Sequence, residues 1–70
     1  MKLKKLKNRK YDFYKIYDAT NNICSGVYFN YKDARRDALN IYQGQGITLE
    51  ICGYKFDSNK IDIVAKCEDF

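Results

Sequence analysis

The sequence predicts an α+β domain of two layers, in which one helix packs on one face of a four-stranded, mainly antiparallel sheet. One segment alone has the pattern of an amphipathic helix, and two strand-like segments lie on each side of it, so the order is β-β-α-β-β. A single helix with one apolar stripe needs one sheet face to cover it. With 70 residues, the chain forms one small domain that buries roughly 60% of its unfolded surface.

The first two strands are expected at residues 11–18 and 23–29. Both segments are rich in tyrosine, phenylalanine, isoleucine and valine, which favour strands. The linking residues 19–22 include two adjacent asparagines, which tolerate the positive φ of tight turns. We therefore expect a β-hairpin.

The helix is expected from Asn30 to Gly44. Asn30 suits the N-cap position, and Asp33 follows it near the positive end of the helix dipole. Gly44 suits the position after the last turn, because glycine adopts the left-handed conformation without steric cost.

The last two strands are expected at residues 47–56 and 61–67, with a polar turn at 57–60 between them. Apolar and polar residues alternate from Ile47 onward, which is typical of a strand with one buried face. The alternation ends at Gly53, where we expect a β-bulge.

Strand alternation and helical spacing together predict the core. In the first strand we choose the register that buries Tyr14 and Ile16, because it keeps Lys15 outside. The residues expected to face inward are Tyr14, Ile16, Val27, Phe29, Ile47, Leu49, Ile51, Ile61, Ile63 and Ala65 of the strands and Ala34, Ala38 and Ile41 of the helix.

Positive charge is concentrated at the start of the chain. The net charge is +4, yet six of the first ten residues are Lys or Arg and the rest of the chain is slightly acidic. We therefore divide the chain into a basic N-terminal arm, residues 1–10, and a single domain, residues 11–70. Such an arm either binds phosphates or an acidic surface, or keeps the protein soluble.

Further cations lie on the expected outward face of the helix. The candidates for contact with nucleic acid or an acidic surface are Lys4, Lys5, Lys7, Arg9 and Lys10 of the arm and Lys32, Arg35 and Arg36 of the helix. A solvated helix face is the other explanation of the helix cations.

The chosen register leaves aromatic side chains on the sheet face away from the helix. The candidate partner-binding residues on this face are Phe13, Lys15, Tyr17, Tyr28, Tyr54 and Lys66. Such a face could stack nucleic-acid bases or form an interface with a protein or a second copy of the chain. It could instead be covered by the N-terminal segment, or consist of tyrosines that pack pairwise across strands.

The sequence offers little for catalysis. It has no histidine, which removes the commonest general base and most metal sites. Cys24, Cys52 and Cys67 contain no C-x-x-C pair, so we expect neither a disulfide framework nor a zinc site, and we interpret them as small apolar strand residues. We therefore expect a protein that is not an enzyme and that has no metal or cofactor.

No segment has the apolar core of about 7–15 residues that a signal peptide requires, or the 18 or so apolar residues of a membrane span. We therefore expect a protein of the host-cell cytoplasm that does not enter a membrane. Its richness in Lys, Asn, Ile and Tyr is typical of an AT-rich genome, such as that of a low-GC bacterium, its phage or a mobile element.

The predicted organisation resembles two groups of proteins. The hairpin followed by a helix, from Tyr11 to Tyr42, is similar to the arm-binding domains of tyrosine recombinases, which read DNA with a sheet. Those domains have three strands before the helix, whereas two are expected here. In size, composition, absent catalytic residues and α+β build, the chain also resembles phage-encoded inhibitors such as anti-CRISPR proteins. That group shares no motif, so the resemblance implies a type of function and assigns no residue a role.

Our hypothesis is a small non-catalytic binding protein, encoded by a phage or a mobile element. It would act as an inhibitor or accessory factor by docking on a protein or a protein–nucleic acid complex. The alternative is a small DNA- or RNA-binding module that uses the basic arm and the helix arginines. A homodimer formed through an edge strand or the open sheet face is also compatible with so small a core.

Overall fold

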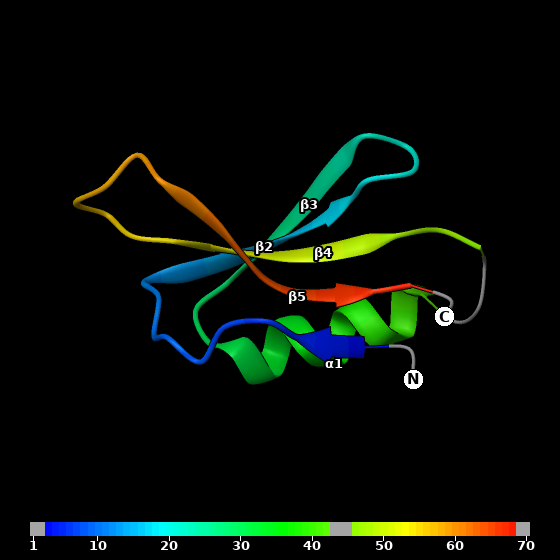
Figure 1. The fold of residues 1–70 in the computed structure, drawn as a ribbon, viewed down its shortest axis with the longest axis horizontal. Helices are drawn as coiled ribbons and strands as arrows, with labels where there is room; N and C mark the ends of the chain where they lie inside the picture. Colours follow the sequence, from blue (N-terminus) through cyan, green and yellow to red (C-terminus); the bar gives the residue numbers. More distant parts are fainter. Residues whose placement is uncertain (1–2, 43–45, 69–70) are drawn as a thin grey trace.

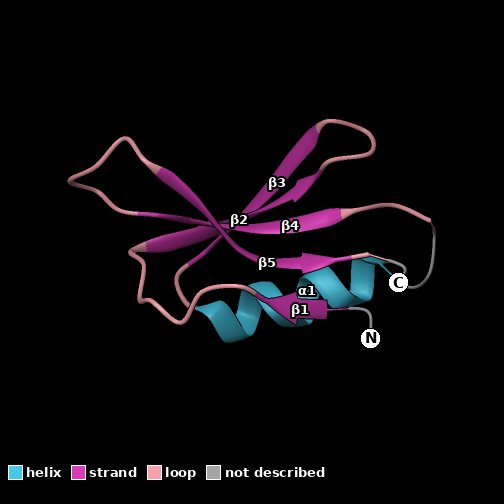
Figure 2. Ribbon diagram, viewed as in Figure 1, coloured by secondary structure: helices cyan, strands magenta, loops and turns pink. Residues whose placement is uncertain are grey.

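A computed structural model describes residues 3–42 and 46–68. Its elements are β1 (Leu3–Lys5), β2 (Phe13–Asp18), β3 (Ile23–Tyr28), α1 (Tyr31–Tyr42), β4 (Leu49–Tyr54) and β5 (Ile61–Cys67). The strands form one antiparallel sheet in the order β1-β5-β4-β2-β3, and α1 packs on one of its faces (Figure 1, Figure 2). The predicted α+β class is therefore confirmed. The predicted number of four strands is wrong, because β1 adds a fifth.

β1 comes from the segment that was expected to be a basic arm. Leu3 is 7% exposed and belongs to the core, while its backbone pairs with Cys67 at the edge of the sheet. After the strand, the N–H groups of Leu6 and Lys7 both donate to the carbonyl oxygen of Val64. Part of the basic segment is thus attached to β5. Its lysines suit an edge strand, because charged side chains discourage pairing with another chain.

Asn30 caps the start of α1, as expected. Its Oδ1 accepts a hydrogen bond from the Asp33 N–H at 2.9 Å, and its Nδ2 donates to the Asp33 carboxylate at 3.0 Å. The cap satisfies one of the backbone donors that the first helical turn leaves unpaired. The helix ends at Tyr42, and Gly44, the expected residue after the last turn, lies outside the described residues.

The core lies between α1 and the sheet. Ala34, Ala38 and Tyr42 recur every four residues and are 0% exposed, so they form the buried stripe of the helix. The stripe continues at Tyr42 rather than at Ile41, which was predicted inward but is 42% exposed. The strands contribute the buried side chains of Leu3, Tyr14, Ile16, Leu49, Ile51, Val64, Ala65 and Cys67.

Most of the predicted inward positions are therefore right. The structure confirms them for Tyr14, Ile16, Ala34, Ala38, Leu49, Ile51 and Ala65. Ile47 is partly buried and packs against the same core.

A β-bulge in β5 accounts for one group of errors. Pairing with β4 passes from Ala65 to Ile63 and leaves Val64 as an extra residue. Val64 and Ala65 are both buried, so the residues before the bulge turn to the other face of the sheet. Ile61 and Ile63, predicted inward, are consequently 56% and 39% exposed. The bulge lies here and not at Gly53.

A second irregularity, in β3, accounts for the other errors. Between Ser25 and Tyr28 the strand has one more residue than the facing part of β2, and Gly26 has a φ of +75° there. Glycine adopts this conformation readily because it lacks a Cβ. The extra residue turns Tyr28 toward the helix side, whereas Val27 and Phe29, predicted inward, are 55% and 73% exposed.

Candidate functional site

The sheet face away from α1 carries a row of apolar side chains across three strands. Ile61 of β5 pairs with Tyr54 of β4, which pairs with Phe13 of β2. The rings of Phe13 and Tyr54 stack nearly parallel, with centroids 4.8 Å apart. Phe56, which follows β4, adds a third ring whose centroid lies 5.5 Å from that of Phe13. Ile61 and Phe56 leave 56% and 77% of their surface exposed.

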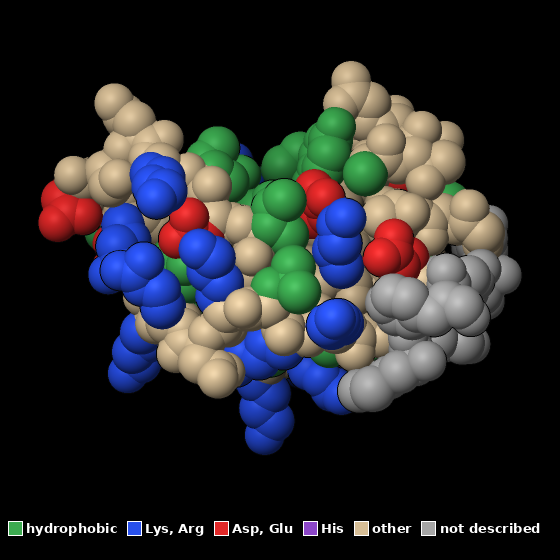
Figure 3. Space-filling view, viewed as in Figure 1, with side chains coloured by type: hydrophobic (Ala, Val, Ile, Leu, Met, Phe, Trp, Pro, Cys, Tyr) green, Lys and Arg blue, Asp and Glu red, His purple; other side chains and the backbone are tan. Residues whose placement is uncertain are grey.

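A second row lies beside the first. It runs from Ile63 through Cys52 to Lys15, whose Nζ lies 5.6 Å from the centroid of the Tyr54 ring. We call the exposed and half-buried apolar side chains of the two rows the open-face patch. It comprises Phe13, Tyr54, Phe56, Ile61 and Ile63 and leaves out Cys52, which is buried. Figure 3 shows hydrophobic side chains exposed over the middle of the sheet, with charged side chains around them.

Farther along the same face the side chains become polar. The Nζ of Lys66 lies 4.0 Å from the Glu50 carboxylate, and Glu50 pairs with Tyr17 of β2. The Tyr17 hydroxyl donates a hydrogen bond to the Asn22 side-chain oxygen in the β2–β3 turn. Lys66 and Tyr17 therefore lie on the open face beside the patch, each with a polar partner.

Tyr28 does not belong to this face, so its predicted position among the open-face aromatics is wrong. It pairs with Tyr14 on the helix side and packs against the core. Burial and the hydrogen-bonded Asp37 carboxylate raise the pKa of Tyr28. A Cβ at Gly26 would lie 2.6 Å from the Tyr28 ring, so the bulge glycine makes room for it.

The three thiols are free, and two of them are buried in the sheet. Burial, with a smaller effect from the Glu50 carboxylate, raises the pKa of Cys52 to about 11. Burial also raises the pKa of Cys67. Neither thiol is activated, because the thiolate is the nucleophilic form. All three cysteines lie in strands, as expected, and Cys24 of β3 is the one whose side chain is exposed.

The cations of the N-terminal segment have different neighbours. Lys5 lies on the helix side, with its Nζ 4.3 Å from the centroid of the Tyr31 ring. Lys4 precedes it in β1 and points to the opposite face of the sheet. Lys7 lies farther along, with its Nζ 4.0 Å from the Asp62 carboxylate.

The helix cations are also divided. Arg36 forms ion pairs with Asp33 at 3.4 Å and with Asp37 at 3.2 Å on the same helix. Lys32 and Arg35 are exposed, as is Lys10 before β2. The positive charge of Arg35 acts on Tyr31, the ring that Lys5 contacts.

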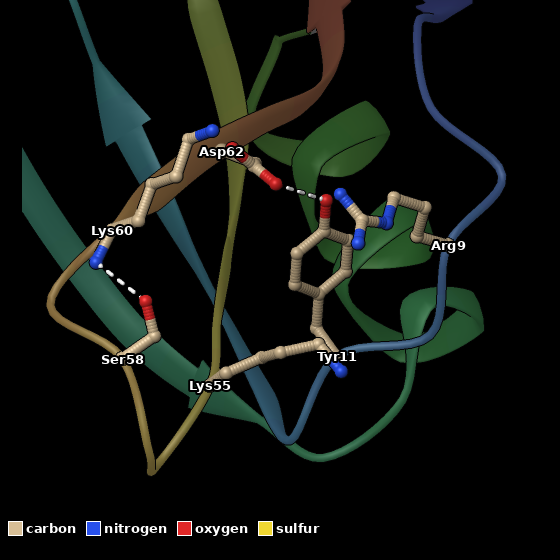
Figure 4. A pocket seen from close by; sticks show the side chains of 6 residues that line it. All are labelled: Arg9, Tyr11, Lys55, Ser58, Lys60 and Asp62. Carbon is tan, nitrogen blue, oxygen red and sulfur yellow. Dashed lines mark hydrogen bonds between the residues drawn. The ribbon is translucent and has the colours of Figure 1, made fainter.

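A basic pocket lies at the end of the molecule that carries the β4–β5 turn (Figure 4). It has a volume of about 100 Å³ and is lined by Arg9, Tyr11, Lys55, Ser58, Lys60 and Asp62. Of these residues, Arg9 was a predicted candidate, and sequence analysis missed Lys55 and Lys60. The available signal was that Lys55 and Lys60 stand at the two ends of the connection between the last two strands, and a hairpin brings these ends together.

Tyr11 and Asp62 form the fixed wall of the pocket. The Tyr11 hydroxyl donates to the Asp62 Oδ2 at 2.6 Å. Burial and this carboxylate raise the pKa of Tyr11 to about 12. The hydrogen bond from Tyr11, and the nearby positive charges of Lys7, Lys60 and Arg9, lower the pKa of Asp62. At neutral pH the pair is therefore a neutral phenol bound to a charged carboxylate.

Comparison of the chain with models of protein families, with curated proteins and with solved structures finds no match. Within residues 3–42 and 46–68, no helix is long and apolar enough to cross a membrane. In the same part of the chain, no three His, Cys, Asp or Glu side chains are grouped so that they could hold a metal ion. The function is therefore argued from the open-face patch and the basic pocket.

Proposed function

We propose that this chain is a small non-catalytic binding protein, an inhibitor or accessory factor that docks on a protein partner through the open-face patch. The observation that carries the proposal is the exposure of the patch on a sheet face that α1 does not cover. Phe56, Ile61 and Ile63 are 77%, 56% and 39% exposed there. Contiguous exposed apolar side chains of this kind are typical of interaction sites.

The composition of the patch favours a protein partner over nucleic-acid bases. A base-stacking platform presents free aromatic faces along a positively charged groove. Here Phe13 and Tyr54 stack on each other, and the exposed side chains beside them, Ile61 and Ile63, are aliphatic. Lys66, the cation farther along the face, lies 4.0 Å from a carboxylate. Aromatic and aliphatic side chains together are typical of the buried centre of a protein interface.

The surroundings of the patch indicate the chemistry of the partner. Lys15 borders the patch from β2 and has no carboxylate within ion-pair distance among the described residues. We therefore expect an apolar partner surface with acidic residues at its border. A standard interface takes about 800 Å² from each partner, which is roughly a sixth of the 4718 Å² that this molecule exposes.

A non-catalytic role agrees with the available side chains. The sequence has no histidine, and burial keeps the thiols of Cys52 and Cys67 protonated at neutral pH. The AT-rich type of composition is the ground for proposing a phage or mobile element as the source.

The test compares two isoleucines of similar exposure on opposite sides of the molecule. The full chain captures its partner from a nuclease-treated lysate of a low-GC bacterium, and calorimetry then measures the dissociation constant for the wild type, Ile61→Ser and Ile41→Ser. Ile61→Ser should weaken binding by about tenfold or more, the loss typical of an interface hot spot. Ile41→Ser, on α1, should bind as the wild type does. Both variants should keep the wild-type urea midpoint, because both side chains are exposed.

Equal affinities for the two variants would overturn the proposal. If the partner is captured from an untreated lysate and not from the nuclease-treated one, the protein would instead be the DNA- or RNA-binding module of the alternative hypothesis. If sedimentation shows a dimer that Ile61→Ser dissociates, the occupant of the patch is a second copy of the chain.

A further inference from the structure

The basic pocket concentrates positive charge around one carboxylate. Arg9, Lys55 and Lys60 line it, and Lys7 reaches the same carboxylate, Asp62, from the segment after β1. Figure 4 shows the ends of Arg9 and Lys60 directed toward Asp62. One carboxylate cannot balance this number of cations, so the pocket carries an excess of positive charge.

The other carboxylates at this end of the molecule do not remove the excess. Asp12 accepts a hydrogen bond from the backbone N–H of Phe56 at 2.7 Å, and Asp57 lies in the β4–β5 turn. Neither side chain lines the pocket. In the described part of the chain, no ion pair involves Arg9, Lys55 or Lys60.

The pocket also supplies hydrogen-bond donors of three kinds. Arg9 offers a planar guanidinium, and Lys55 and Lys60 offer ammonium groups. The Ser58 Oγ accepts the backbone N–H of Lys60 at 3.1 Å, which fixes the turn and leaves the hydroxyl hydrogen to donate. Guanidinium, ammonium and hydroxyl groups are the donors that bind phosphate oxygens, and all three kinds line this pocket.

The carboxylate of Asp62, which also lines the pocket, is already bound to other groups of the protein. One oxygen of Asp62 accepts the Tyr11 hydroxyl at 2.6 Å, and the other lies 4.0 Å from the Nζ of Lys7. Both oxygens thus have partners on the protein. Asp62 fixes the Tyr11 wall of the pocket, and its one negative charge leaves the positive charge of Arg9, Lys55 and Lys60 in excess.

We propose that this pocket binds a single phosphate group. Its volume of about 100 Å³ is well below the roughly 300–1,000 Å³ of pockets that enclose whole drug-sized ligands, so the pocket itself takes one small group. Phosphate presents several charged acceptor oxygens, which match the donors of Arg9, Lys55, Lys60 and Ser58. The phosphate belongs either to a small molecule or to the backbone of a nucleic-acid strand, and both present the same oxygens to the pocket.

The test is an amide NMR titration of the full chain with inorganic phosphate, with sodium chloride at matched ionic strength as the reference. Amides of residues 55–62 should shift and saturate with phosphate and stay in place with chloride. The variant Lys55→Gln/Lys60→Gln should weaken phosphate binding by about tenfold or more, because each lost charge-assisted hydrogen bond is worth a factor of that order. The control Lys32→Gln/Arg35→Gln removes the same charge from α1 and should change the dissociation constant by less than about twofold, since neither residue lines the pocket and exposed charges are screened by salt.

A third variant tests the role given to the carboxylate. Asp62→Asn keeps an oxygen to accept the Tyr11 hydroxyl and removes the negative charge, so it should tighten phosphate binding. Equal shifts with phosphate and chloride would overturn the proposal, as would an equal loss in the helix control or weaker binding by Asp62→Asn.

A second titration identifies the source of the phosphate. A twelve-nucleotide single-stranded DNA that displaces inorganic phosphate from the same amides assigns the pocket to a nucleic-acid backbone. If phosphate binds and the oligonucleotide does not displace it, the ligand is a small phosphorylated molecule. The open-face patch has no part in this titration, so its outcome is independent of the protein-docking test.

Discussion

Tyr11 is the residue that ties the start of the chain to the last hairpin. Its hydroxyl binds Asp62, which lies 51 residues away in sequence, and its ring packs over Gly53. A Cβ at Gly53 would come within 2.6 Å of that ring, so this glycine is required for close contact. The strand alternation suggested a bulge at Gly53, whereas the residue serves to seat a tyrosine.

The Tyr11–Asp62 pair makes stability depend on pH at both ends of the scale. The folded pKa of Tyr11 is raised from 10.0 to about 12, so its contribution is present below pH 10 and is lost as the pH rises toward 12. The folded pKa of Asp62 is lowered from 3.8, so its contribution is present above that pH and is lost as the pH falls below it. The pair therefore stabilises the fold most between about pH 4 and 10.

We predict that Tyr11→Phe lowers the free energy of unfolding within this window and that its difference from the wild type shrinks outside it. Urea unfolding of both proteins from pH 3 to 12, in steps of about one unit, measures the difference. Asp62→Asn should in addition lower the pKa of Tyr11, which ultraviolet absorbance of the phenolate reports. A difference between Tyr11→Phe and the wild type that is the same at every pH would contradict the prediction.

Single residues also show where sequence reasoning worked and where it stopped. Burying Tyr14 and Ile16 to keep Lys15 outside was enough to place Phe13 and Tyr17 on the open face. That inference is local, because alternation within one strand fixes it. The basic pocket could not be inferred in this way, because its walls come from segments that meet only when β5 lies beside the start of the chain.

At the scale of elements, α1 is the best-predicted part of the chain, because its signals are local. The Asn30 cap, the acidic first turn and the alanine spacing all act within the helix. Only the last position of its buried stripe was misplaced, at Ile41 instead of Tyr42, since both residues fit an apolar stripe by spacing alone.

We predict that Asn30→Ala destabilises the protein by about 0.5–2 kcal/mol, the cost typical of a lost N-cap. The substitution removes the acceptor for the Asp33 N–H and the donor to its carboxylate. The change in the urea midpoint measures the effect. Asn40→Ala is the matched control, because Asn40 is exposed on the same helix and caps nothing; it should leave the midpoint nearly unchanged. Equal effects of the two substitutions would show that the cap contributes no stability of its own.

The two bulges explain why the strands were predicted less well than the helix. One extra residue in a strand shifts the alternation, so every side chain beyond it points to the opposite face of the sheet. A strand can therefore be predicted at the correct residues while its buried residues are predicted wrongly. In β5 the reversal moves Ile61 and Ile63 from the predicted core to the open face, and in β3 it moves Tyr28 the other way. Gly26, with its positive φ, was the visible sign in β3, whereas nothing about Val64 distinguishes it from a regular strand residue.

At the scale of the whole molecule, the helix covers one face of the sheet and leaves the other face apolar. The reversal in β5 is what makes the uncovered face so apolar, because it adds two isoleucines to the aromatic row. The exposure of Phe56, Ile61 and Ile63 on this face is the feature on which the proposed docking rests.

The fifth strand was missed because the lysines around Leu3 suggested a solvated arm. We predict that deleting residues 1–5 destabilises the fold by about 1.5–3 kcal/mol, the range for exposing one buried leucine. Leu3 is 7% exposed, and its strand pairs with β5. Urea unfolding measures the loss. Lys10→Gln, which removes charge without touching β1, should leave stability unchanged, and an unchanged midpoint after the deletion would mean that β1 is not part of the stable sheet.

The pairing of β1 with β5 also sets the order in which the fold can be completed. The ribosome makes β1 first, yet its only partner in the sheet order is the last of the described strands. While the intervening chain emerges, the β2–β3 hairpin and α1 have little to pack on, because an isolated hairpin is at best marginally stable. Contacts between segments so distant in sequence also form slowly. β1 therefore has no strand to pair with in this sheet until β5 has been synthesised, and the lysine-rich segment stays outside the sheet until then.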